Sequence, residues 1–385
     1  MIRAPVRPEL LRWARERAGV RAVEDLAGRF PRLGEWEAGT AEPTLKQLDA
    51  FAHAVHVPVG YLFLPQPPEE RLPIPDYRTL PGHAVRRPSP DLIDTLHACQ
   101  ERQGWYRDFA ATVRLPDAEF VGSADLAERP EAVAGRMANR LAFDLGARAD
   151  CRTWEEALRL FVAQADRIGV LVMMSGIVRS DTHRTLDPEE FRGFALADRK
   201  APLVFVNGAD TKAGQMFTLA HELAHLWLGA SGVSDIGGRP ADGHQREEVW
   251  CNAVAAELLV PLAALRPALI DAEPLDAAMA RLARRFKVST LVILRRMLDA
   301  GALTRAAFEA AWVRERARLR GLMQPGAGGG NFYRATLARV SRRFARAVVE
   351  STLEGQTLYR DAFRMLGVAK TESFNRIGRE VGSLP

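Results

Sequence analysis

The run His221-Glu222-Leu223-Ala224-His225 constrains this chain more than any other feature of its sequence. The residue pattern around it is helical, with Asp210 as the expected N-cap and Gly229 as the expected end. At about 100 degrees per residue, the two histidines and Glu222 fall within one arc of that helix. Two imidazoles four residues apart can bind one zinc ion, and the Glu between them can take a proton from a zinc-bound water. The run therefore predicts a zinc site on a helix.

A third ligand is needed, because a catalytic zinc usually has three protein ligands and one exchangeable position. The next predicted helix, from Gln245 to Val260, offers Glu247, Glu248 and Glu257. Glu248 is favoured because alanines at 253, 255 and 256 would let two helices approach, and Glu247 is the alternative. Glu257 lies about half a turn round from Glu248. Asn252 shares the face of Glu248 and is expected to support the ligand from behind.

Short β-prone segments precede the histidine run. Residues 169–174, 193–197 and 202–207 are apolar and bounded by turn residues, whereas residues 91–167 follow helical patterns. The sequence thus predicts an α+β fold that is mostly α, with a small sheet packed on the histidine helix in a domain spanning residues 91–270. We expect an extended substrate to pair with a sheet edge such as Gly193 to Ala197.

Residues 1–66 predict a compact helical domain, with Thr44 as the N-cap of its last long helix. Its characteristic residues are Leu11, Ala14, Arg15, Gly19, Leu26-Ala27, Glu35-Trp36-Glu37-x-Gly39, Pro43-Thr44 and Gln47-Leu48. With these residues the domain resembles the helix-turn-helix domains of the Cro/repressor-like (XRE) class. In that class the second helix of the pair enters the major groove, and the corresponding segment here is Pro31 to Trp36. Arg29, Arg32 and Lys46 are the candidates for DNA contact. Nine basic and eight acidic residues give little attraction for a phosphate backbone, so a module that recognises only protein is the alternative.

The remaining segments are read from composition. Eight prolines between Pro65 and Pro90 predict a stiff linker at residues 67–90 or a strap along a surface, and the linker is favoured. Residues 271–325 predict helices, in which the rhythm from Leu282 to Ser289 resembles another helix-turn-helix. Residues 326–385 begin with a glycine-rich break and continue as a basic helical tail.

Composition also bears on location and redox state. No run approaches the roughly 18 apolar residues of a membrane span, and the first residues lack the apolar segment of a secretory signal. A cytoplasmic protein without a membrane partner is expected. Cys99, Cys151 and Cys251 are widely spaced and odd in number, which predicts buried thiols instead of a disulfide framework. Nothing in the sequence indicates the oligomeric state.

The segments Phe217 to His225 and Glu248-x-x-x-Asn252-Ala253-x-Ala255-Ala256-Glu257-Leu258-Leu259-x-Pro261 resemble the ImmA/IrrE family of metallopeptidases. The resemblance covers about residues 150 to 300. It implies a zincin-like domain with zinc bound by His221, His225 and Glu248, and with Glu222 as general base. Members known to act cleave repressors of the helix-turn-helix class, so the implied partner is a repressor or antitoxin-like protein.

Two points stay open at this level. The donor that would stabilise the oxyanion is not identified, with His244 and His183 as candidates. The competing function is a DNA-binding regulator or antitoxin in which the metal-binding fold serves as a sensor or scaffold.

Overall fold

The computed structural model describes residues 3–70, 72–76, 88–234, 245–322 and 331–384. The chain forms two compact units, which we describe separately. Unit 1 comprises Met1–Pro73 with Arg86–Asp94, and unit 2 comprises Ile74–Val85 with Thr95–Pro385. The predicted fold class is confirmed, because helices make up most of the described chain and the only sheet among these residues has four strands.

Unit 1 contains short helices around an apolar core that includes Leu10, Leu48 and Phe51. Thr44 caps the last long helix as predicted: its side chain accepts from the Gln47 N–H, and the Gln47 side chain accepts from the Thr44 N–H. The elements are α1 (Pro8–Arg17), α2 (Glu24–Ala27), α3 (Leu33–Glu37), α4 (Leu45–Ala54) and a 3-10 helix, η1 (Val59–Phe63).

The sheet of unit 2 has the strand order β1-β3-β2-β4. β1 is parallel to β3, while β2 is antiparallel to both β3 and β4. The prediction that residues 193–197 form a sheet edge is wrong, because β2 has a hydrogen-bonded strand on each side. The strands are β1 (Leu171–Ser175), β2 (Gly193–Leu196), β3 (Leu203–Asn207) and β4 (Gly232–Ser234).

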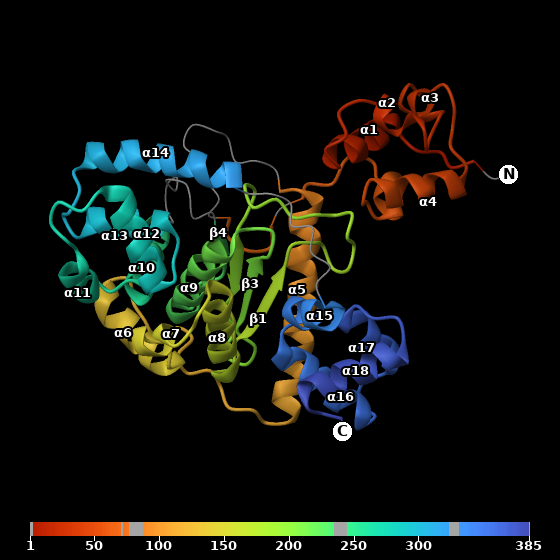
Figure 1. Cartoon of the computed structure of the whole chain (residues 1–385). Coiled ribbons are helices and arrows are strands. Elements are labelled where there is room, and N and C mark those ends of the chain that lie inside the picture. The colour runs from red at the N-terminus through yellow and green to blue at the C-terminus, as the bar shows by residue number, and fades with distance from the viewer. Residues whose placement is uncertain (1–2, 71, 77–87, 235–244, 323–330, 385) are drawn as a thin grey trace. The chain divides into compact units, whose positions relative to one another are not determined.

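Helix α9 (Lys212–Leu228) carries the histidine run. Thr211, not Asp210, is its N-cap, because the Thr211 hydroxyl accepts from the Gly214 N–H at 3.0 Å. The helix ends at Gly229, where φ is 74°, as predicted. α9 packs on β2 and β3 and beside α8 (Trp154–Arg167) and α10 (Gln245–Leu259), as Figure 1 shows. Its polar face is therefore as buried as its apolar face.

Further helices enclose this core. In the predicted second helix-turn-helix, Lys287 adopts a left-handed conformation and Ser289 caps the next helix by accepting from the Val292 N–H. Six helices complete this part: α5 (Pro90–Thr112), α6 (Pro130–Leu141), α7 (Leu145–Ala149), α12 (Leu275–Phe286), α13 (Thr290–Asp299) and α14 (Arg305–Leu322). Two short elements follow α10: α11 (Leu262–Leu265) and η2 (Arg266–Ala268).

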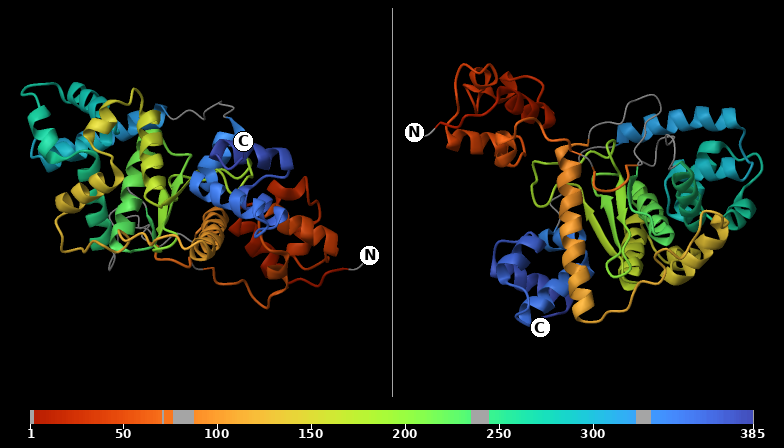
Figure 2. Two further views of the ribbon diagram at one scale, coloured as in Figure 1. Left: turned by 90° about the horizontal axis from the view of Figure 1, so that it is seen from below. Right: turned by 180° about the vertical axis from the view of Figure 1, so that it is seen from behind.

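The basic tail is a packed group of four helices with a core that includes Phe344, Val348 and Phe374. Two of these helices, α15 and α16, contact β1. Figure 2 shows α5 and the C-terminal helices on the side of the sheet away from α9. The helices are α15 (Phe332–Val340), α16 (Arg342–Leu353), α17 (Tyr359–Leu366) and α18 (Thr371–Val381).

The proline-rich stretch is not a plain linker over its whole length. The Val233 N–H of β4 donates to the Pro75 carbonyl at 3.0 Å, and Asp76 forms a parallel bridge with Val233. The interpretation as a surface strap therefore holds for Pro75 and Asp76. Over the described residues no single helix is long and apolar enough to cross a membrane, although the bent pair Arg246–Leu259 and Leu262–Ala268 meets that test together.

Candidate metal centre

Three side chains from two helices converge in the interior of unit 2. The Nε2 atoms of His221 and His225, on α9, are 3.1 Å apart. Glu248, on α10, places Oε1 3.0 Å from His225 Nε2 and Oε2 3.3 Å from His221 Nε2. All three residues are buried, with Glu248 only 1% exposed. The structure thus brings together the two histidines and the glutamate that the sequence favoured.

Glu222 lies beside this cluster with a carboxylate that is fully buried. Burial raises the pKa of Glu222 to about 8, and the nearby Glu248 carboxylate acts in the same direction. His221 and the Ser234 side chain, a hydrogen-bonding neighbour, act against this rise. An acid with this pKa exchanges its proton near neutral pH, which suits a general base.

The cluster residues shift one another's pKa. Burial raises the pKa of Glu248, but the two histidines outweigh it and hold that pKa well below its usual range. Burial lowers the pKa of His221, yet the Glu248 carboxylate more than compensates, and the net shift is upward. Burial prevails at His225, whose pKa is lowered. Glu248 is therefore a carboxylate under ordinary conditions, which is the form that binds a cation.

The donor set fits a divalent metal ion. His221, His225 and Glu248 each offer one ligand atom, and these atoms all lie within 4.8 Å of one another. Two imidazoles and a carboxylate are the set that many catalytic zinc sites use. The buried Glu222 carboxylate is the group that such a site needs close by.

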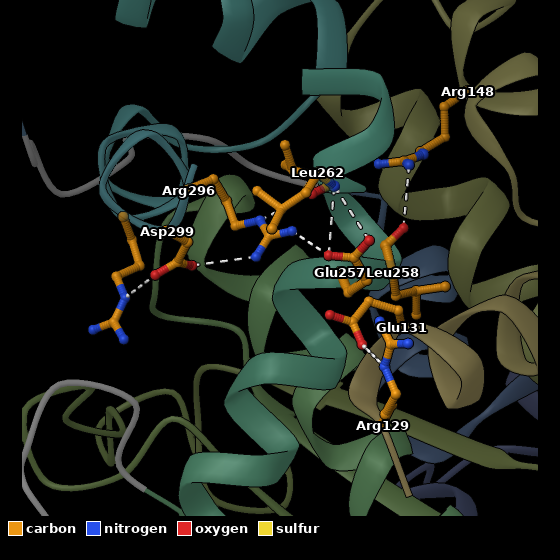
Figure 3. A network of polar contacts seen from close by, with 10 residues as sticks. Arg129, Glu131, Arg148, Glu257, Leu258, Leu262, Arg296 and Asp299 are labelled. Carbon is orange, nitrogen blue, oxygen red and sulfur yellow. Dashed lines mark hydrogen bonds and ion pairs between the residues drawn. The ribbon is translucent and has the colours of Figure 1, made fainter. Parts of the chain in front are cut away.

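Glu257 is turned away from the cluster. Figure 3 shows it pointing to Arg296 of α13, with which it forms a buried ion pair, and it also accepts from the Leu262 N–H at 3.2 Å. Arg148 lies close by and donates to the carbonyls of Leu258 and Leu259 at the end of α10. These contacts fix the C-terminal end of the helix that carries Glu248.

Two residues of the site were not anticipated from the sequence. Ser234, the last residue of β4, has its hydroxyl 3.4 Å from His225 Nε2 and 3.3 Å from Glu248 Oε1. Gly193 of β2 faces Glu222, because a Cβ there would lie 3.0 Å from Glu222 Oε1 and 2.6 Å from Thr218 Cγ2. A three-residue strand leaves no periodic pattern, and a lone glycine in a strand is only a weak sign of close approach.

The remaining candidates are distributed as follows. Asn252 is half-buried one turn after Glu248, and its side chain raises the pKa of His221 as a hydrogen-bonding neighbour. His183 is exposed in the segment between β1 and β2, and the buried cluster does not include it. His244 lies outside the described residues. Glu247, the alternative ligand, is half-buried, and it is Glu248 that reaches the histidines.

The three basic residues predicted for DNA contact line one groove of unit 1, with Phe30, Trp36 and Leu45 among its apolar walls. Arg32 forms an ion pair with Glu35 at 2.6 Å, which offsets its charge. Arg29 and Lys46 line the same groove. Helix α3 overlaps the segment from Pro31 to Trp36 that was expected to enter the major groove, and it has only five residues.

The cysteines fit the expectation of buried thiols in two cases of three. Cys99 and Cys251 are buried and Cys151 is half-buried, and all three are free. Burial raises the pKa of Cys251 well above its usual value, so its thiol stays protonated.

The fold and the cluster together define a protein with a metallopeptidase-type domain. Residues 165–298 match the family model described as the IrrE N-terminal-like domain, which spans about a third of the chain and includes His221, Glu222, His225 and Glu248. This match supports the resemblance to the ImmA/IrrE family. Residues 340–380, within the C-terminal helices, match a model described only as a domain of unknown function. No curated protein matches the chain.

Proposed function

We propose that this protein is a cytoplasmic, zinc-dependent endopeptidase that controls transcription by cleaving a repressor or antitoxin-like protein. The observation that carries the proposal is the buried convergence of His221, His225 and Glu248 next to the fully buried carboxylate of Glu222. A buried acid is costly, so its presence beside a cation site points to a chemical role.

The chain's own residues would divide the work of hydrolysis. A divalent metal held by the cluster would polarise water and the peptide carbonyl, and would favour the ionised form of Glu222. Glu222 takes the proton of the attacking water and passes it to the amine that leaves. Asn252 supports the imidazole of His221. Burial of the site excludes other water from the reacting groups.

The substrate strand is better assigned to β4 than to β2. β2 is interior, whereas the outer side of β4 pairs with Pro75 and Asp76 through one hydrogen bond and one bridge. We infer that an extended peptide takes this outer side, because β4 ends at Ser234 among the cluster atoms. The inference replaces the edge expected from the sequence.

A trap variant tests the proposal. Glu222→Gln should retain zinc, since it leaves the three cluster residues intact, but should lose cleavage of a repressor captured from cells. Glu247→Gln, an acid on the helix of Glu248, is the matched control and should keep both properties. Zinc analysis, followed by identification of proteins held by the trap, gives the answer. Cleavage at the normal rate by Glu222→Gln would refute the assigned role.

The competing function, a DNA-binding regulator with the metal fold as a sensor or scaffold, is favoured only by the groove that Arg29, Arg32 and Lys46 line. Replacing Arg29 and Lys46 with Ala distinguishes the two. A promoter binder should lose affinity for its own promoter in a salt-dependent way, whereas a peptidase should keep cutting.

A further inference from the structure

The Ser234 hydroxyl lies where a fourth ligand of the cluster would lie. Its two close contacts, at 3.4 Å and 3.3 Å, are to His225 Nε2 and Glu248 Oε1, the two atoms that also approach each other at 3.0 Å. Ser234 is fully buried, like the two histidines. Its hydroxyl thus contacts the metal-binding atoms of His225 and Glu248 themselves.

The spacing matches a tetrahedral site. Zinc binds nitrogen and oxygen ligands at about 2.0 to 2.1 Å, which places neighbouring ligand atoms of a tetrahedron about 3.3 to 3.4 Å apart. Between the three predicted ligands, His221 Nε2 lies 3.1 Å from His225 Nε2 and 3.3 Å from Glu248 Oε2, and His225 Nε2 lies 3.0 Å from Glu248 Oε1. The Ser234 hydroxyl lies at the same tetrahedral spacing, 3.4 Å from His225 Nε2 and 3.3 Å from Glu248 Oε1.

The fold explains how a strand end reaches the cluster. Ser234 is directly opposite Gly193 in the register of β4 and β2, so their side-chain positions share one face of the sheet. A Cβ on Gly193 would lie 3.0 Å from Glu222 Oε1, so that face is the one against α9. The Ser234 hydroxyl therefore emerges between β4 and the histidine helix.

The strand is also held from its outer side. The Val233 N–H, one residue before Ser234, donates to the Pro75 carbonyl at 3.0 Å. On the inner side the Arg192 N–H donates to the Ser234 carbonyl at 3.5 Å. The backbone on both sides of the serine is engaged, which keeps its hydroxyl at the cluster.

We propose that Ser234 is a fourth metal ligand in the resting protein, so that the site is closed by a serine hydroxyl until a peptide on the outer side of β4 moves the strand. The proposal rests on the proposed function, because it needs a metal at the cluster. It assigns Ser234 a binding role and β4 a role in opening the fourth position.

Cobalt(II) provides a direct test with the full-length protein. Ser234→Cys loaded with cobalt should show a new near-ultraviolet absorption from thiolate-to-metal charge transfer, because only a ligand atom at this position can give it. Ser231→Cys is the matched control: the Ser231 hydroxyl, near the other end of the same strand, accepts from the Ala197 N–H, and this variant should match the wild type. Cobalt bound by Ser234→Cys without the new absorption would overturn the proposal.

A second measurement does not depend on a thiol in the core. In competition with a chromophoric chelator, Ser234→Ala should bind zinc at least about tenfold more weakly than the wild type, whereas Ser234→Thr, which keeps the hydroxyl, should stay close to it. A residue that only supports the ligands can cause a similar loss, so the cobalt spectrum of Ser234→Cys distinguishes a ligand from a supporting residue. Equal zinc affinity of the Ala variant and the wild type would rule Ser234 out as a ligand. Failure of the wild type to bind either metal would instead refute the proposed function.

Discussion

A half-buried acid outside the metal centre, Asp166 at the end of α8, makes the stability of this protein depend on pH. Its carboxylate accepts from the Ser341 hydroxyl at 3.0 Å. Burial nevertheless raises the pKa of Asp166 from its ordinary 3.8 to about 6. The folded state holds this proton more tightly than the unfolded chain does. The contribution of Asp166 to the free energy of unfolding is therefore most favourable below pH 3.8 and is lost as the pH rises to about 6.

The substitution Asp166→Asn removes that dependence while keeping an oxygen that can accept from Ser341. A shift of about two pKa units corresponds to about 3 kcal/mol, so the variant should be more stable by up to about 3 kcal/mol near pH 7.5. Near pH 4.5 the gain should fall to about 1 kcal/mol, because folded Asp166 is then protonated and the unfolded acid partly so.

Urea unfolding of both proteins at the two pH values measures the difference directly. Asp108→Asn, an exposed acid on α5, is the control and should change the free energy of unfolding little at either pH. A gain for Asp166→Asn that is the same at both pH values, or a loss near pH 7.5, would contradict the reasoning.

Other expectations follow from single contacts. Gly193→Ala should lower the free energy of unfolding, measured by thermal melting, by about 1 to 3 kcal/mol, because the new Cβ would crowd Thr218 and Glu222. It should also reduce the rate of cleavage, and an unchanged rate would show that catalysis does not need this space. Glu257→Gln should cost about 1 to 3 kcal/mol, because the buried Arg296 guanidinium loses one carboxylate and keeps only its ion pair with Asp299. Zinc content should not change, and lost zinc would make Glu257 a ligand after all. Removing metal with a chelator should lower the melting temperature, and zinc at about 100 times its Kd should restore about 2.7 kcal/mol of stability. A melting temperature that does not change with zinc would contradict a buried metal site.

The sequence was most informative where chemistry and helical spacing coincide. His221, His225 and Glu248 were placed together because a helical period fixes which side chains share a face, and the small alanines of α10 allow close packing with α9. The sequence predicted the bounds of β1, β2 and β3 to within a few residues, because short apolar runs bounded by turn residues are typical of strands.

The rest depended on long-range pairing. Strand order decides that β2 is interior and that Ser234 reaches the histidines, and no local pattern encodes which strands are neighbours. The N-cap moved from Asp210 to Thr211 because either side chain can cap a helix, and only the fold decides which one accepts from Gly214. The turn of Pro75 against β4 likewise depends on a partner far along the chain.

The contacts made by the two edge strands of the sheet, β1 and β4, affect how copies of this protein associate. Unpaired strand edges are templates on which other chains can add and aggregate. Here α15 lies against β1, and the Val233 N–H on the outer side of β4 is already bonded to Pro75. The chain's own backbone therefore occupies part of the outer side of β4, which should weaken strand-to-strand association between copies at that edge.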